Sequence, residues 1–182
     1  MTTEAATLFF AILAVAAQLA VVSAIALVVG GALSATLADA RTALAEVVRP
    51  QAVWLACLVA LVCTAGSLYL SEVADFAPCR LCWYQRYAMY PLVPLLAVAA
   101  WRRWIWVWVP GVLVATIGGT ISTWHLLIER YPSLESGSCD PTNPCSLIWV
   151  RRFGYLTIPT MALSGFALIV TLLLASRPPA TD

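Results

Sequence analysis

Five long apolar runs constrain the fold of this chain more than any other feature of its sequence. They cover residues 8–31, 52–70, 83–101, 104–128 and 156–175. Each approaches or exceeds the roughly 20 residues that an α-helix needs to cross the hydrocarbon core of a bilayer. Hydrophobic residues make up 62% of the chain and charged residues only 10%, a balance that ordinary soluble domains do not have. We therefore predict an all-α integral membrane protein, a four-helix transmembrane bundle with one additional N-terminal transmembrane helix.

The first apolar run could also be read as a cleaved signal peptide. A signal peptide needs a basic segment before its apolar core, but residues 1–7 carry only Glu4 as a charged side chain. We expect a retained helix, followed over residues 33–50 by an amphipathic helical connector that ends at Pro50. The chain then divides into residues 1–50, the N-terminal helix with its connector, and residues 51–182, a four-helix core.

A Cys-x-x-Cys motif stands directly before the third apolar run. Residues 78–86 read Pro-Cys-Arg-Leu-Cys-Trp-Tyr-Gln-Arg, so Cys79 and Cys82 can close on each other as a disulfide. The helix predicted to follow has Cys82 in its first turn, where unpaired N–H groups and the helix dipole favour a thiolate. Arg86 lies four residues further, on the same helix face and about 6 Å deeper. A cation at that depth is costly to place there by chance. Its position beneath the cysteine pair favours the interpretation of the pair as a redox-active dithiol. The motif is also found in zinc sites and in structural disulfides.

Four further cysteines fall into two groups. Cys139 and Cys145 lie in the polar segment after the fourth run, in Cys-Asp-Pro-Thr-Asn-Pro-Cys, whose composition predicts a turn. Cys57 and Cys63 lie inside the second run, six residues apart, so they cannot face each other on a helix. We interpret Cys57 and Cys63 as small packing residues.

The number of crossings places both paired-cysteine segments on one side of the membrane, because two predicted spans separate them. The arginines are too evenly divided between the two sides to fix the orientation by the positive-inside rule. Paired cysteines persist outside the cytoplasm, which predicts that these segments and the N-terminus are extracytoplasmic and the C-terminus is cytoplasmic. The net charge is +1 and no long basic run occurs, so the sequence lacks the basic patch that nucleic-acid binding requires.

His125 is the only histidine, close to the end of the fourth run. It is expected about 6 Å below the outer surface, at a depth similar to that of Arg86. Two polar groups at matched depth could hydrogen-bond the carbonyl oxygens of a quinone dissolved in the bilayer. The alternative is an interfacial histidine that is bonded to a neighbouring backbone carbonyl.

These motifs together resemble the DsbB/BdbC family of membrane thiol:quinone oxidoreductases. The matching residues are Pro-Cys-Arg-Leu-Cys-Trp-Tyr-Gln-Arg at 78–86, Gly-Gly-x4-Trp-His at 118–125, Cys-x5-Cys at 139–145 and Thr-Ile-Pro at 157–159. The resemblance implies a thiol oxidase of the bacterial inner membrane that reoxidises an exported thioredoxin-like (DsbA-like) protein. It would pass the electrons to ubiquinone or menaquinone and so support disulfide bond formation.

The resemblance also implies roles for individual residues. It implies the disulfides Cys79–Cys82 and Cys139–Cys145, both on the periplasmic or extracytoplasmic side. By this analogy, Cys139 receives the thiol of the partner protein and Cys145 exchanges with Cys79. Cys82 then passes electrons to the quinone with the help of Arg86, and His125 lies close to the quinone.

Three other interpretations stay open at this point. The four paired cysteines could hold zinc as a tetrahedral thiolate site. They could also be structural disulfides in a protein without turnover. A vitamin K epoxide reductase-like protein would share the Cys-x-x-Cys motif and the quinone, although its motif usually lies late in the core. Four cysteines allow three connectivities, which the sequence alone does not separate.

Overall fold

The computed structural model describes residues 2–135, 139–140 and 142–178 of the chain. Over these residues the protein is about 79% helical, without strands, which confirms the predicted all-α fold. The α-helices are α1 (Thr3–Gly31), α2 (Ala35–Val48), α3 (Ala52–Glu72), α4 (Arg80–Trp101), α5 (Trp108–Arg130) and α6 (Ile158–Ala175). Short 3-10 turns occur at η1 (Arg49–Gln51), η2 (Ile105–Val107) and η3 (Pro132–Leu134).

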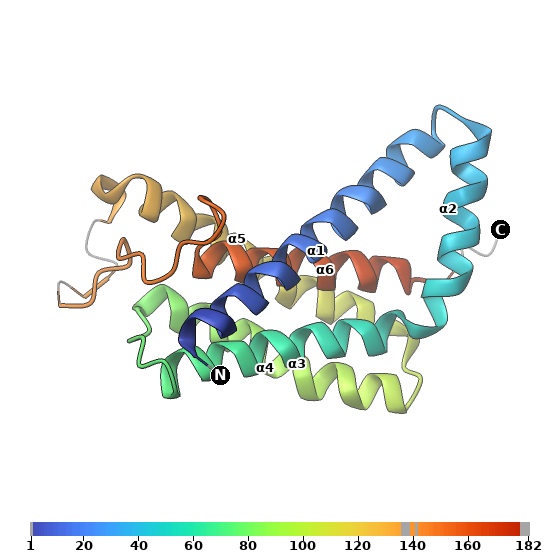
Figure 1. Cartoon of the computed structure of the whole chain (residues 1–182). Coiled ribbons are helices and arrows are strands. Elements are labelled where there is room, and N and C mark those ends of the chain that lie inside the picture. The colour runs from blue at the N-terminus through green and yellow to red at the C-terminus, as the bar shows by residue number, and fades with distance from the viewer. Residues whose placement is uncertain (1, 136–138, 141, 179–182) are drawn as a thin grey trace.

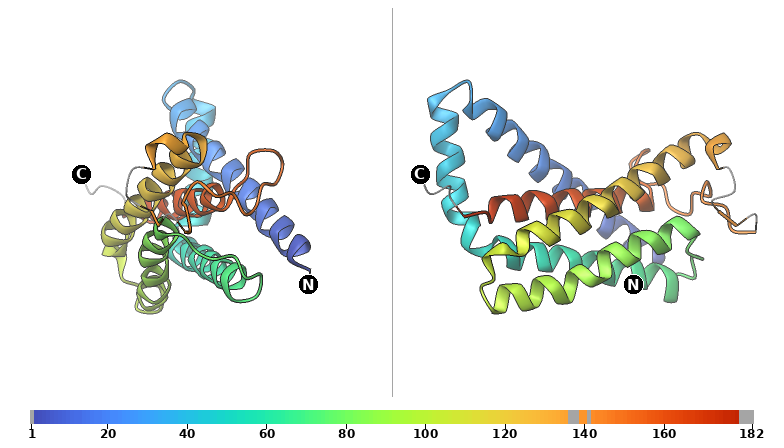
Figure 2. Two further views of the ribbon diagram at one scale, coloured as in Figure 1. Left: turned by 90° about the vertical axis from the view of Figure 1, so that its left-hand side faces the viewer. Right: turned by 180° about the vertical axis from the view of Figure 1, so that it is seen from behind.

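Helices α3 to α6 run up and down beside one another and form a four-helix bundle (Figures 1 and 2). The bundle core is built from fully buried aliphatic and aromatic side chains of α4 and α6, closed by alanines of α3 and α5. The largest of them are Leu92, Leu96, Phe166, Ile169 and Leu173. The apolar runs fold as helices because a helix satisfies its own backbone hydrogen bonds in a medium without water.

Among the described residues, four helical stretches are long and apolar enough to cross a membrane. They are Thr3–Gly31, Ala35–Glu72, Ile105–Arg130 and Ile158–Ala175, the second of which joins α2, η1 and α3. Helix α4 is not among them, although its 22 residues match its neighbours in length and it packs against both α3 and α5. Its first turns carry Arg80, Gln85 and Arg86, which make it more polar than its neighbours. The chain is therefore a multi-pass membrane protein, and the most polar helix of its four-helix bundle is the one that begins at the Cys-x-x-Cys motif.

A close approach between α5 and α6 depends on one glycine. A Cβ atom at Gly118 would lie 2.3 Å from Cζ of Phe166, which is a steric clash. At Gly119 the nearest atom would be 3.7 Å away, which is ordinary contact. The close packing of α5 against α6 therefore rests on Gly118, because small residues allow membrane helices to approach each other closely.

Helix α1 lies against the outside of the bundle along only part of its length. Its buried residues, which include Ala11, Ala14 and Ala17, all lie in its first half, and this half packs against α6. The second half leaves the bundle and connects to α2, which has no buried residue and runs across the end of the bundle away from the cysteines (Figure 1). The predicted connector is therefore helical, although α2 ends at Val48 and Pro50 lies in η1. The end of the chain beyond Pro178 lies outside the described residues.

Candidate redox site

The two cysteine-bearing segments meet at one end of the bundle, as the number of crossings predicts. The side-chain amide of Asn143 donates a hydrogen bond to the carbonyl oxygen of Pro78 at 3.2 Å. The rings of Phe76 and Trp149 stack with their centroids 5.3 Å apart. These two contacts hold the segment before α4 against the segment between α5 and α6.

Cys79 and Cys82 lie where the chain enters α4. Cys79 is the N-cap residue, and its sulfur accepts a hydrogen bond from the backbone N–H of Cys82 at 3.3 Å. The two sulfur atoms are 2.9 Å apart and are thiols in this structure, so the Cys79–Cys82 disulfide stays a prediction. Cys82 lies in the first turn of α4 as expected. The sulfur that accepts a hydrogen bond from a backbone N–H at the start of the helix is, however, that of Cys79.

Several donors converge on the Cys79 sulfur, which is 5% exposed. The hydrogen bond from the Cys82 thiol is the largest of the influences that lower the pKa of Cys79 to about 4, and His125 and the Cys82 backbone add to it. Burial works in the opposite direction, because it disfavours the charged form. The reduced pair is therefore poised to carry its first negative charge on Cys79.

Cys139 and Cys145 form a disulfide. The carboxylate of Glu135 accepts hydrogen bonds from the backbone N–H of Cys145 and, at 2.6 Å, from the hydroxyl of Ser146. These two hydrogen bonds hold Cys145, one end of the loop that the disulfide closes, in place. Pro141, part of the predicted turn between the two cysteines, lies outside the described residues.

His125 lies between the two cysteine pairs and is 3% exposed. Its Nε2 is 3.0 Å from the carbonyl oxygen of Cys145 and 3.7 Å from the sulfur of Cys79. Its Nδ1 is 3.1 Å from the amide nitrogen of Gln85. A carbonyl oxygen only accepts, so Nε2 carries the hydrogen, and Nδ1 can then accept from the Gln85 amide. The sequence predicts His125 at a quinone beside Arg86, whereas in the structure its ring is directed at the Cys79 sulfur and the Cys145 backbone carbonyl oxygen.

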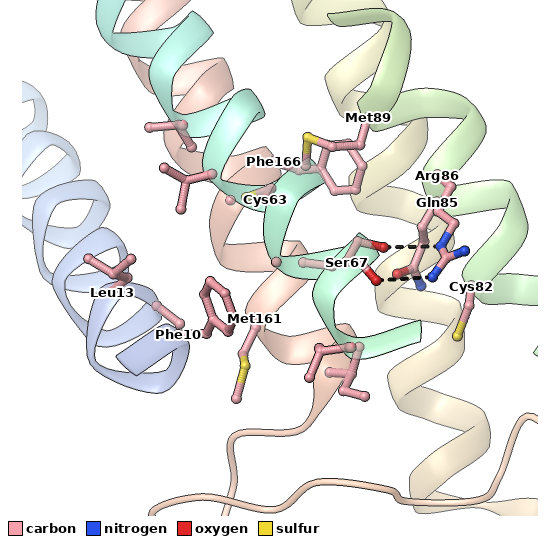
Figure 3. A pocket seen from close by; sticks show the side chains of 18 of the residues that line it. Phe10, Leu13, Cys63, Ser67, Cys82, Gln85, Arg86, Met89, Met161 and Phe166 are labelled. Carbon is pink, nitrogen blue, oxygen red and sulfur yellow. Dashed lines mark hydrogen bonds between the residues drawn. The ribbon is translucent and has the colours of Figure 1, made fainter. Parts of the chain in front are cut away.

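A largely apolar cavity of about 430 Å³ opens beside the first pair. It is bordered by α1, α3, α4 and α6, and Cys82, Gln85 and Arg86 line one end of it (Figure 3). Cys82 and Arg86 therefore share one face of α4, as their spacing predicts. His125 is not among the residues that line this cavity over the described part of the chain.

Arg86 is held in place from α3. Its Nε donates to the hydroxyl oxygen of Ser67 at 3.0 Å, and its Nη2 donates to the Ser67 carbonyl oxygen at 3.1 Å. The guanidinium carbon is 5.1 Å from the centroid of the Trp83 ring, within the range of a cation–π contact. The cation beneath the cysteine pair thus has hydrogen-bond acceptors that compensate part of the cost of burying it.

Each cysteine pair has one buried and one more accessible sulfur. Cys79 and Cys145 are buried, at 5% and 1% exposure. Cys79 contacts the His125 ring through its sulfur, and Cys145 contacts it through its backbone carbonyl oxygen. Cys82 and Cys139 are only partly buried. Cys82 lines the apolar cavity and Cys139 lies in the loop, so the two accessible sulfurs are open to different reaction partners.

Three residues at this site were not assigned a role from the sequence. Gln85 stood inside the quoted motif, where its spacing of three from Cys82 was a usable signal. Ser67 is a single serine in an apolar run, and Glu135 is one of several acidic residues in a polar segment. Neither has a sequence signal, because their roles depend on which segments the fold brings together.

The structure does not join all four paired cysteines into one group that could hold a metal, because Cys139 and Cys145 are bonded to each other. The potential ligand atoms of Cys79, Cys82 and His125 do lie within 4.8 Å of one another. Two thiolates and an imidazole are ligands that zinc accepts. A three-residue zinc site is therefore an alternative for the reduced pair that experiment can test.

Comparison with known proteins gives one family and several curated relatives. The family model "Disulfide bond formation protein DsbB" matches residues 49–176. "Disulfide bond formation protein C" of Bacillus subtilis is 42% identical over 114 residues, which cover 62% of this chain and 83% of the relative. "Probable disulfide formation protein" of Oceanobacillus iheyensis is 41% identical over 122 residues, 66% of this chain and 82% of the relative. A protein of the same description from Metapseudomonas resinovorans is 37% identical over 124 residues, 66% and 85% of the two chains.

No solved structure matches the chain at a significant level. The family match includes α3 to α6 with both cysteine pairs. It leaves α1 and α2 outside.

Proposed function

The chain belongs to the DsbB family of disulfide bond formation proteins, and we propose that it reoxidises an exported thioredoxin-like dithiol protein and passes the electrons to a membrane quinone. The family supports a disulfide-forming oxidoreductase, and the apolar helices make it a multi-pass membrane protein. The proposal also places it in the bacterial cytoplasmic membrane with both cysteine pairs on the extracytoplasmic side, where disulfides persist.

The observation that best supports this function is that His125 joins the buried cysteines of the two pairs, Cys79 through its sulfur and Cys145 through its backbone carbonyl oxygen. The two more accessible sulfurs face different surroundings. A structural disulfide has no need for a second pair beside it. A relay between a protein in solution and an acceptor in the membrane needs two neighbouring cysteine pairs, each with one accessible sulfur. The reason is that thiol–disulfide exchange proceeds through direct contact of the sulfur atoms.

The first step is exchange with the partner protein. A partner thiolate attacks Cys139, the more accessible sulfur of the loop disulfide, and the bond to Cys145 breaks with its electron pair on the Cys145 sulfur. The second partner thiol then displaces Cys139, so that the partner leaves with a disulfide and the two electrons and two protons of its dithiol stay with this chain or the solvent.

The second step carries the reduction from the loop pair to the pair at α4. Cys145 attacks Cys79 of an oxidised Cys79–Cys82 pair and releases Cys82 as the thiolate. Cys139 then attacks Cys145, which restores the loop disulfide and leaves Cys79 and Cys82 as a dithiol. The sulfur pattern of the structure, a loop disulfide beside two thiols, corresponds to this stage.

The cavity fits a quinone by its chemistry. Its walls are mainly apolar, and the N–H groups of Arg86 and Gln85 and the Cys82 sulfur are at one end. A bound quinone supplies a two-electron, two-proton acceptor. Cys82 is then the sulfur that meets the acceptor, Arg86 and Gln85 orient the acceptor by donating hydrogen bonds, and the apolar walls exclude water. Ubiquinone and menaquinone share the ring carbonyls that these donors recognise.

The test compares Cys82→Ala with Cys57→Ala, a buried cysteine of the bundle core that lies outside the site. Each purified variant receives a reduced thioredoxin-like protein and quinone, and quinol formation, partner thiols and bound zinc are measured. We expect Cys82→Ala to abolish quinol formation and Cys57→Ala to keep the parent rate. Partner oxidation at the parent rate in Cys82→Ala would refute the assignment. Stoichiometric zinc in the parent, with thiols that stay reduced in the presence of quinone, would favour the metal site instead.

A further inference from the structure

We propose that α1, one of the four helices that border the cavity, binds the hydrophobic tail of the quinone, an inference that rests on the function proposed above. The family match begins at residue 49, so α1 is an addition to the matched core. Three features of α1 support a role in binding beyond that of a membrane anchor: the face it turns to the cavity, the way it is fixed to the bundle, and the shape of its contact with α3.

One face of α1 lines the cavity. Its lining residues are Phe10, Leu13, Ala14, Ala16 and Ala17. Spacings of three and four residues place most of them on the same helix face. Figure 3 shows Phe10 and Leu13 extending from α1 on one side of the cavity, with Cys82 and Arg86 on the other.

Polar contacts fix α1 to the core on both sides of this lining segment. Before it, Nη2 of Arg152 donates to the hydroxyl oxygen of Thr7 at 2.8 Å and to the carbonyl oxygen of Glu4 at 3.2 Å. After it, the Gln18 amide donates to the Ser164 hydroxyl at 3.0 Å. Residues 10–17 are therefore held in a defined position.

The contact between α1 and α3 leaves space instead of closing it. Phe10 reaches over Gly66, where a Cβ atom would lie 2.9 Å from its ring. One turn further along, the small side chains of Ala14 and Ala17 follow, and the cavity continues between them and Leu58 and Val62 of α3. The alanines that follow Phe10 and Leu13 leave room on this face for an apolar cavity that extends to Cys82.

The occupant of such a cavity is an amphiphile with a polar head and a long apolar chain. The donors of Arg86 and Gln85 are confined to the α4 end, whereas the residues that α1 contributes are all apolar. Residues without hydrogen-bonding groups discriminate by apolar contact, so α1 recognises the tail and not the ring. A quinone with an isoprenoid tail has this chemistry, and a tail-free quinone lacks the part that α1 would contact.

The first experiment detects binding without turnover. The parent protein is irradiated with a quinone that carries a photoreactive group in its tail, and the labelled residues are mapped by mass spectrometry. We expect label on residues 10–17 that excess unlabelled long-tailed quinone removes and tail-free quinone does not. Label confined to α3, α4 and α6 would overturn the inference even if the protein reduces quinone.

The second experiment compares Leu13→Trp with Leu19→Trp, a matched change at a position that is 63% exposed and does not line the cavity. A tryptophan at position 13 would fill part of the cavity and displace part of the quinone tail. If the displaced part makes contacts equal to those of one buried leucine, the loss is worth about 1.5 kcal/mol, or roughly tenfold in affinity. Leu13→Trp should therefore raise KM for long-tailed quinone about tenfold and leave KM for tail-free quinone unchanged. Leu19→Trp should change neither value.

The outcomes separate this inference from the proposed function. Equal KM values in the two tryptophan variants would overturn the role of α1 and leave the relay intact. A parent protein that reduces neither quinone would remove the proposed function itself. If Leu13→Trp does not fold, Ala17→Leu replaces it, and the labelling of the parent protein decides independently.

Discussion

His125 offers the sharpest test of how the two cysteine pairs are coupled, through the variant His125→Ala. The imidazole Nε2–H lies 3.7 Å from the Cys79 sulfur and stabilises its thiolate. Removing the ring removes this donor, while the hydrogen bond from the Cys82 thiol, the larger influence, stays in place. The pKa of Cys79 should therefore rise in the variant and still remain below the ordinary value for a thiol.

The size of the effect follows from the contact. A hydrogen bond to a charged group is worth about 1.5–3 kcal/mol, and a long bond to sulfur belongs in the lower part of that range. One pKa unit corresponds to about 1.4 kcal/mol, so we expect an increase of about one to two units. The sign is fixed because the lost donor stabilises only the charged form of Cys79.

The measurement is the pH dependence of alkylation at Cys79 in the reduced protein, resolved by mass spectrometry. In the parent protein, whose Cys79 pKa is lowered to about 4, the rate should be nearly constant above about pH 6 and fall as the pH approaches that value. The midpoint in His125→Ala should lie at higher pH. The control is Thr123→Ala, an exposed position on the same helix whose hydroxyl bonds only to Gly119 of that helix.

A midpoint that stays in place in folded His125→Ala protein, or that moves to lower pH, would refute the coupling between the histidine and Cys79. Thermal unfolding of each variant shows whether the protein is folded. Because the same Nε2–H also bonds to the carbonyl oxygen of Cys145, exchange between the two pairs should slow in His125→Ala as well.

Two further substitutions test the supports of the site. Gly118→Ala should lower the unfolding temperature in detergent, since overpacking costs about 1–3 kcal/mol. Gly119→Ala should leave the unfolding temperature nearly unchanged. Equal effects of the two substitutions would show that α5 and α6 do not meet at residue 118. Ser67→Ala removes one acceptor from Arg86 and should slow quinone reduction several-fold without affecting partner exchange at the loop disulfide. Its control is Thr120→Ala, an exposed position on α5 that does not line the cavity and whose hydroxyl bonds to the Thr116 carbonyl oxygen. A quinone reduction rate in Ser67→Ala equal to that of Thr120→Ala would show that the Ser67 hydroxyl does not position the cation.

The helices of the bundle were largely predictable from the apolar runs. The run at residues 52–70 became Ala52–Glu72, the run at 83–101 became Arg80–Trp101, and the run at 156–175 became Ile158–Ala175. The reason is physical: in lipid a chain must satisfy its backbone hydrogen bonds internally, so a long apolar run has few alternatives to a helix. The run at 104–128 became the helical stretch Ile105–Arg130, in which a 3-10 turn at residues 105–107 precedes α5.

The position of α1 was not predictable in the same way. Its sequence is apolar on every side, which predicts a membrane helix but no particular neighbour. The contacts that dock it involve Arg152 and Ser164, residues more than 140 positions away along the chain. Only the fold shows that its first half borders the cavity and its second half leaves the bundle.

The sequence by itself determined that four sulfurs gather at one end of a helical membrane protein and that Arg86 lies below Cys82. Apolar run length and helical spacing are local properties, and they fix these facts without tertiary contacts. The tertiary structure alone decided that Cys79 and Cys145 turn inward to His125, that Cys82 turns to the cavity, and that Ser67 anchors the cation. These relations depend on how each helix is rotated and on the path of the loop, which are set by packing between distant segments.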